Sequence, residues 1–151
     1  MHIFVDISAN PQTKCAIGCY LVIPGLDVDI TQIKNLLKNI KLSATTSTAA
    51  ELELIDIVLT NTQPQVDPIY LYTDCNNFYN LSVKKSYSET HHSAELYAKL
   101  LSHIERLNLN VIKVTGHMKK SLQITLPQQI FSIVDKLARK CLRNHLKDLD
   151  S

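Results

Sequence analysis

The order of the apolar segments constrains the fold of this chain most strongly. Residues 2–8 and 15–23 are apolar and rich in β-branched side chains, and Asn10 and Pro11 between them favour a turn. This pattern predicts a β-hairpin at the start of the chain. Helical and strand-like segments then alternate, which predicts an α/β fold: a mixed five-stranded sheet, with antiparallel opening strands followed by parallel strands, and helices on both faces.

The later segments are assigned from the spacing of their apolar residues. We expect helices over 47–60, 76–81, 93–107 and 127 to about 145, strands over 69–73 and 109–115, and loops over 82–92 and 118–126. Residues 26–46 fit either a helix, with apolar side chains at 33, 36, 37 and 40, or a strand over 39–44. Periodicity does not decide between these two interpretations over so short a run.

Composition indicates one ordinary globular domain spanning 1–151. The chain is 45% hydrophobic and 20% charged, and its net charge of +2 does not by itself indicate a nucleic-acid partner. No two of the four cysteines have C-x-x-C spacing, and there is no secretory leader or apolar run of membrane-spanning length. We therefore expect free thiols, a cytoplasmic location, no membrane contact and a monomer.

Four acidic residues stand at unusual or suggestive positions. Asp6 interrupts an apolar strand, Glu51 lies in the helix at 47–60, Asp74 ends the strand at 69–73, and Asp135 adjoins the apolar stripe of the last helix. Each of the last three has an ordinary structural explanation. Glu51 stands three residues after Thr48, the spacing of a capping box. Asp74 fits a helix N-cap, and Asp135 can form an ion pair with Arg139.

Taken together, the four acids indicate a metal centre. Carboxylates that converge repel one another unless a cation lies among them. Oxygen ligands select hard ions such as Mg²⁺ or Mn²⁺, and two such ions about 4 Å apart catalyse displacement at phosphorus. His91, His92 and Glu95 also have a spacing that allows a metal pair, but no second motif supports it.

The ordered set of motifs resembles type 1 ribonuclease H. The matching pieces are FVDIS around Asp6, AAELELIDIVL around Glu51, YLYTDCNN around Asp74, the Gly-His pair at 116–117, and IVDKLARK around Asp135. The resemblance extends from Ile3 to about Arg143. It departs from the family in having Ile7 where a glycine usually follows the first Asp, and in lacking the basic, Trp-bearing extra helix of some members.

The resemblance implies a ribonuclease H-like sheet and hydrolysis of the RNA strand of RNA–DNA hybrids, which leaves 5′-phosphate products. Asp6, Glu51, Asp74 and Asp135 would hold two Mg²⁺ ions, with Mn²⁺ as a possible substitute. One ion would activate the attacking water and the other would stabilise the leaving 3′-oxyanion. His117 would act from a mobile loop near the water or the departing phosphate.

A protein that selects RNA in a hybrid must contact 2′-hydroxyl groups in a shallow minor groove. Short polar side chains near the acids suit this role, although turn and cap chemistry explains them equally well. The candidate substrate-binding residues are Asn10, Thr46, Ser47, Thr48, Asn76, Lys119 and Lys120. A basic stripe on the last helix is either a solvated face or a phosphate-contacting patch; it comprises Lys136, Arg139, Lys140, Arg143 and Lys147.

Three alternative functions remain open at this point. A proofreading-type exonuclease normally has a second acid two residues after the first Asp, where this chain has Ser8. A transposase or integrase core would lack an acid corresponding to Glu51. A catalytically weak or inactive ribonuclease H-like binding module is compatible with the low charge, although the complete set of acids argues against it.

Overall fold

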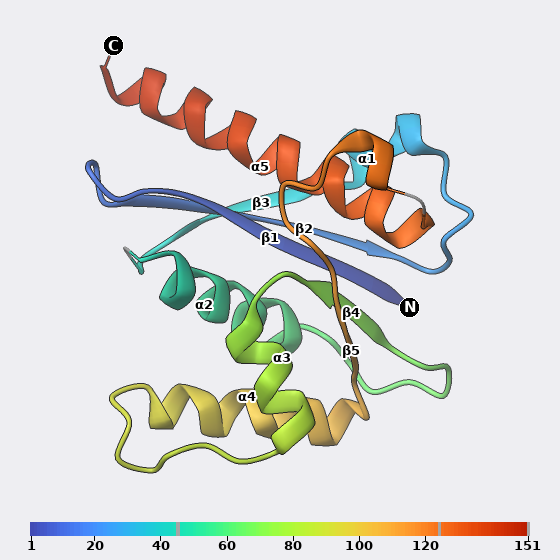
Figure 1. Cartoon of the computed structure of the whole chain (residues 1–151), viewed down its shortest axis with the longest axis vertical. Helices are drawn as coiled ribbons and strands as arrows, with labels where there is room; N and C mark the ends of the chain where they lie inside the picture. The colour runs from blue at the N-terminus through green and yellow to red at the C-terminus, as the bar shows by residue number, and fades with distance from the viewer. Residues whose placement is uncertain (45, 124, 151) are drawn as a thin grey trace.

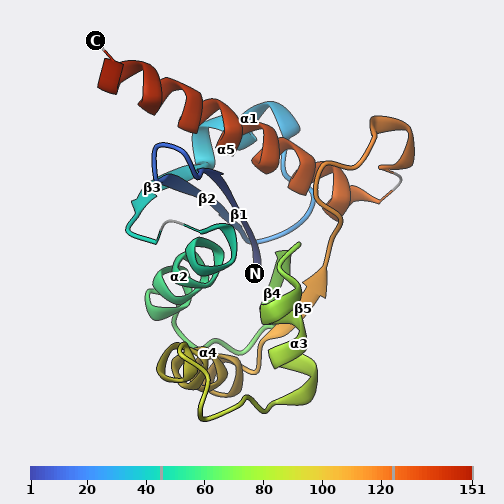
Figure 2. The same cartoon turned by 60° about the vertical axis from the view of Figure 1, so that its left-hand side comes forward.

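One sheet with helices on both faces makes up the computed structural model, which describes residues 1–44, 46–123 and 125–150 (Figures 1 and 2). Positions 45 and 124, inside the expected segments 26–46 and 118–126, lie outside the described residues. So does position 151, the end of the expected domain. The architecture is the α/β class that the alternation of segments predicted.

The sheet has five strands in the order β3-β2-β1-β4-β5. They are β1 (His2–Asn10), β2 (Cys15–Ile23), β3 (Lys38–Leu42), β4 (Tyr70–Thr73) and β5 (Asn110–Lys113). Neighbouring strands run antiparallel from β3 to β1 and parallel from β1 to β5. The predicted opening hairpin and parallel second half are therefore confirmed, and each parallel connection passes through helix, as such crossovers require.

The helices divide between the two faces of the sheet. They are α1 (Ile30–Leu36), α2 (Ser47–Thr60), α3 (Asn76–Lys84), α4 (Ala94–Leu107), α5 (Leu126–Asp150) and the short 3₁₀ helix η1 (Lys120–Leu122). Figure 1 shows α2, α3 and α4 on one side and α1 and α5 on the other. Because side chains alternate along a strand, Ile3 and Val5 pack toward α2, whereas Phe4 packs toward α5. None of the helices in the described ranges is long and apolar enough to cross a membrane.

Residues 26–46 contain both of the elements that the sequence left open. Asp29 caps α1, because its Oδ1 accepts a hydrogen bond from the Thr31 amide at 3.0 Å. The helix has only seven residues and buries Ile33. The chain then enters β3 directly and pairs with β2. Because the helix and the strand are both short, neither the helical nor the strand spacing of apolar residues extends far enough to be recognised in the sequence.

Several element boundaries differ from those expected. Helix α3 continues to Lys84, so residues 82–84 are not loop, and it ends at Lys85 in the left-handed conformation (φ 52°). Strand β5 covers only 110–113. Helix α5 starts at Leu126, one residue before Pro127, and extends to Asp150. Short loops and helix ends carry few periodic residues, which explains why sequence patterns place them poorly.

Gly18 allows helix α2 to lie close to the sheet. A Cβ atom at Gly18 would be 2.7 Å from Leu54 Cδ1, too close for any real side chain. The glycine therefore brings α2, and with it Glu51, down onto the strands that carry the other acids.

Candidate metal centre

Three carboxylates from separate elements meet at one edge of the sheet. Asp6 lies on β1, Glu51 on α2 and Asp74 directly after β4, and one ligand oxygen from each lies within 4.8 Å of the others. Asp6 and Glu51 are buried, and Asp74 is half-buried. Among residues 1–44, 46–123 and 125–150, no other group of three or more acidic, histidine or cysteine side chains lies close enough together to hold a metal ion.

Strand pairing brings Asp6 and Asp74 together. Strands β1 and β4 are parallel neighbours, and Phe4 pairs with Tyr72. Two residues further along each strand, the side chains of Asp6 and Asp74 emerge at the same edge of the sheet, because strand side chains repeat every second residue. The sequence placed Asp6 inside the first strand and Asp74 at the end of a later one, and the parallel pairing of β1 with β4 brings the two acids together.

Glu51 belongs to the acidic cluster and does not cap its helix. The N-cap of α2 is Thr46, whose Oγ1 accepts a hydrogen bond from the Ala49 amide at 3.4 Å, so the capping-box interpretation of Thr48 and Glu51 is wrong. Glu51 is instead 8% exposed and accepts a hydrogen bond from the Thr73 hydroxyl at 3.5 Å. It faces the sheet from the first turns of the helix.

Asp74 is likewise not an N-cap. Helix α3 has Cys75 at that position, and no side chain caps it. Thr73 organises this turn, because its hydroxyl oxygen accepts a hydrogen bond from the Cys75 amide at 3.0 Å while its proton points to Glu51. The Asp74 carboxyl group therefore lies beside that of Glu51 and raises the Glu51 pKa.

Asp135 and His117 extend the cluster on the side of α5. The buried carboxyl group of Asp135 lies next to that of Asp6 and raises the Asp6 pKa. Its Oδ2 lies 3.1 Å from His117 Nδ1 and 3.6 Å from a guanidinium nitrogen of Arg139. The i,i+4 pair with Arg139 is therefore present, but it accompanies a role in the cluster and does not replace it.

His117 is held at the cluster by its backbone. It adopts the left-handed conformation (φ 53°), and its side chain is 69% exposed although it contacts Asp135. The preceding Thr115 is fixed to α5 by two hydrogen bonds with Gln128, from the Thr115 amide at 3.1 Å and to the Thr115 carbonyl at 2.8 Å. An exposed imidazole on an anchored segment can reach a ligand in solvent while staying beside the acids.

Gly116 provides the room that Asp74 needs. A Cβ atom at Gly116 would lie 2.3 Å from Asp74 Oδ2, well inside any allowed contact. A larger residue here would displace the Asp74 carboxylate, because the glycine backbone approaches it without a side chain in between.

Burial and mutual repulsion raise the pKa values of the acids in the cluster. Burial, followed by the negative charge of Asp74, raises the pKa of Asp6 to about 10. The same two causes, in the same order, raise the pKa of Glu51 to about 9. A cation among these groups would remove the penalty, since an opposite charge favours the ionised carboxylate. The ligands are all oxygens, a set that suits hard cations.

A comparison with models of known protein families gives no match for this chain, and a search of curated proteins also gives none. The geometry of the cluster therefore carries the functional argument.

The remaining predicted site residues lie on turns and helix starts. Asn10 Oδ1 accepts hydrogen bonds from the amides of Gln12 and Thr13 at 3.0 and 3.2 Å, so it stabilises the hairpin turn. Ser47 and Thr48 are exposed in the first turn of α2, and Asn76 is exposed as the first residue of α3. Lys119 and Lys120 are exposed at η1.

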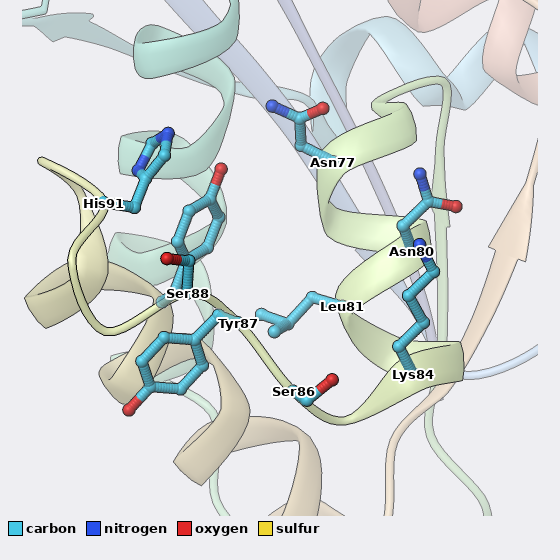
Figure 3. A pocket seen from close by; sticks show the side chains of 9 residues that line it. Asn77, Asn80, Leu81, Lys84, Ser86, Tyr87, Ser88 and His91 are labelled. Carbon is cyan, nitrogen blue, oxygen red and sulfur yellow. The ribbon is translucent and has the colours of Figure 1, made fainter.

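The sequence did not indicate a pocket of about 230 Å³ between α3 and the following loop. Figure 3 shows Asn77, Asn80 and Lys84 on the helix, with Ser88 and His91 on the loop. His91 Nδ1 accepts a hydrogen bond from the Ser93 amide at 3.0 Å, and its ring stacks on that of His92. Among the described residues, the histidines and Glu95 do not gather into a metal-holding group.

Proposed function

We propose that this protein is a metal-dependent endonuclease of the type 1 ribonuclease H kind, which hydrolyses the RNA strand of RNA–DNA hybrids. The observation that best supports this proposal is the convergence of four acids from β1, α2, the end of β4 and α5, with His117 against one of them. Their order along the chain is the order that the resemblance implies.

The four acids would hold Mg²⁺, as two ions, with Mn²⁺ as a possible substitute. When bound, Mg²⁺ supplies the positive charge that activates a water nucleophile and stabilises the leaving oxygen. Asp6, Glu51 and Asp74 would hold the metal through ionised carboxylates, a form that burial without a cation disfavours. Asp135 joins them through its contact with Asp6.

The other residues of the site orient groups and handle protons. Gly116 leaves Asp74 free to turn toward its neighbours, and Thr73 orients Glu51 by donating a hydrogen bond. The exposed His117 imidazole can serve in proton transfer, because histidine is the side chain most often used as a general acid or base. Its contact with Asp135 keeps it beside the reacting phosphate in this proposal.

Exposed polar groups next to the acids support recognition of RNA. Ser47, Thr48 and Asn76 lie on the first turns of the two helices that adjoin Glu51 and Asp74. Short hydroxyl and amide side chains can contact 2′-hydroxyl groups in the minor groove. Lys119 and Lys120, exposed in the loop after His117, would contact phosphates in this proposal.

The direct test is cleavage of an end-labelled RNA–DNA hybrid with Mg²⁺, Mn²⁺ or EDTA. We expect cuts in the RNA strand with either ion, 5′-phosphate ends, and no cleavage with EDTA or of the same RNA alone. Asp6→Asn and Asp74→Asn should abolish cleavage, whereas Asp67→Asn, a change at an exposed acid before β4, should not. Binding of the hybrid without cleavage under all of these conditions would instead indicate a nucleic-acid-binding module.

A further inference from the structure

Lys113, the last residue of β5, extends a positive charge into the acidic cluster. Its ammonium group donates a hydrogen bond to the main-chain carbonyl of Asp74. Its charge also acts on Glu51, where it opposes the effect of burial on the pKa of that carboxyl group. The contact with the Asp74 main chain and the effect on Glu51 therefore place the lysine at the edge of the cluster.

The register of β5 explains why Lys113 faces the cluster. Val111 packs against the core under α2 and α4, and Val114 packs against the core under α5. Because side chains alternate along a strand, Lys113 shares the face of Val111, which is also the face that carries Glu51. The lysine is exposed, so its ammonium reaches the edge of the cluster from solvent.

We propose that Lys113 is a built-in cation at the edge of the cluster, beside Glu51 and the main chain of Asp74, which lowers the affinity of the site for divalent cations. The inference rests on the proposed function, because it takes these acids to be metal ligands. It adds a residue that sets how much free metal the protein needs.

The physical reason is competition between positive charges. A divalent ion that enters the cluster is attracted by the carboxylates and repelled by the ammonium group. Since Lys113 is exposed, salt must screen this repulsion: the screening length falls from about 10 Å at 0.1 M salt to about 3 Å at 1 M. A purely structural role for the lysine would not show this salt dependence.

The test measures binding of Mn²⁺ to the full chain by electron paramagnetic resonance. We expect Lys113→Met to bind Mn²⁺ more tightly than wild type, by about three- to tenfold at low salt. The difference should disappear in 1 M salt. Lys113→Arg, which keeps the charge, should bind as wild type does.

Lys147→Met is the matched control. It removes one exposed lysine, but it lies twelve positions beyond Asp135 on α5, about 18 Å along the helix. Its Mn²⁺ affinity should match wild type.

Two results would overturn the inference in different ways. If wild type binds Mn²⁺ and Lys113→Met binds equally or more weakly, the lysine only anchors the chain at Asp74, and the proposed function is unaffected. If wild type binds no Mn²⁺, the metal centre itself is wrong, and the role of Lys113 falls with it.

Discussion

Gly116 and Asp74 are in such close contact that the glycine backbone forms one wall of the carboxylate's position: a Cβ atom on Gly116 would lie 2.3 Å from Asp74 Oδ2. Gly116 follows β5, whereas Asp74 follows β4, the neighbouring parallel strand. The segments that follow β4 and β5 are therefore packed closely together, and the absence of a side chain at Gly116 allows the Asp74 carboxylate its observed orientation.

Gly116→Ala should displace Asp74 and damage the site while leaving the fold in place. Misplacement of a reacting group by about 1 Å can cost roughly 10²-fold in rate, so hybrid cleavage should fall by at least that factor. Gly25→Ala is the control, since the new Cβ there meets only the end of the exposed Asp27 side chain, at 2.8 Å. Equal rates for wild type and Gly116→Ala would show that Asp74 need not keep its present position.

The stability of the metal-free protein should fall as pH rises. The pKa of Asp6 is raised from 3.8 to about 10 and that of Glu51 from 4.5 to about 9, so the folded chain keeps protons that the unfolded chain has lost. The stabilisation is complete below the unfolded pKa values and is lost as pH rises through the folded ones. Melting temperatures in EDTA should therefore decline between about pH 4 and pH 10.

Asp6→Asn supplies the check on this pH dependence. The amide carries no charge, so the variant should melt higher than wild type in EDTA at pH 8, and its melting temperature should vary less with pH. Saturating Mg²⁺ should raise the melting temperature of wild type much more than that of the variant. A wild-type curve that is flat with pH would contradict the raised pKa values.

His117 should accelerate turnover without being essential for the binding of metal. The informative variant is His117→Asn, because asparagine tolerates the left-handed backbone found here (φ 53°) better than alanine does. Loss of a proton-transferring group should lower the cleavage rate by about 10²-fold and alter its pH profile between pH 6 and 9. Mn²⁺ affinity should stay near that of wild type; an unchanged rate and profile would make His117 a bystander.

Arg106 should contribute to stability and not to chemistry. Its guanidinium group donates to the carbonyls of Leu59 and Thr62 at the end of α2, at 2.5 and 3.1 Å, and to His103 Nδ1 at 3.0 Å. Arg106→Met leaves these acceptors without their charged donor, which should cost about 1–3 kcal/mol of unfolding free energy in urea titrations. Cleavage rates below the unfolding transition should not change, because this contact lies at the opposite end of α2 from Glu51.

Sequence patterns located the acids more reliably than they explained them. Asp6 interrupts an apolar strand and Asp74 follows another, so both stood out in the sequence, and the parallel pairing of β1 with β4 is what makes them neighbours. Glu51 also fitted a capping box, since the same spacing serves both roles. Its true role depends on how deeply α2 packs, which Gly18 decides through a contact with Leu54 that lies far away in sequence.

Other features of the site had no local signal. Lys113 looks like any exposed strand lysine until the carbonyl of Asp74 is placed beside it. Two hydrogen bonds between Gln128 and Thr115 join α5 to the segment after β5, and neither sequence segment contains a motif that predicts them. Such contacts arise only when separate elements are assembled, so a single sequence indicates residue types but not these partners.

The contact between Asp6 and Asp135 joins the first strand to the last helix, and this has a consequence for synthesis. Protein chains leave the ribosome N-terminus first. A nascent chain that has reached residue 120 already carries Asp6, Glu51 and Asp74, but its acidic cluster lacks the carboxylate that α5 brings. The complete cluster forms only when α5 has been translated and has docked on the sheet, so a partly made chain is held back from any chemistry that needs all four acids.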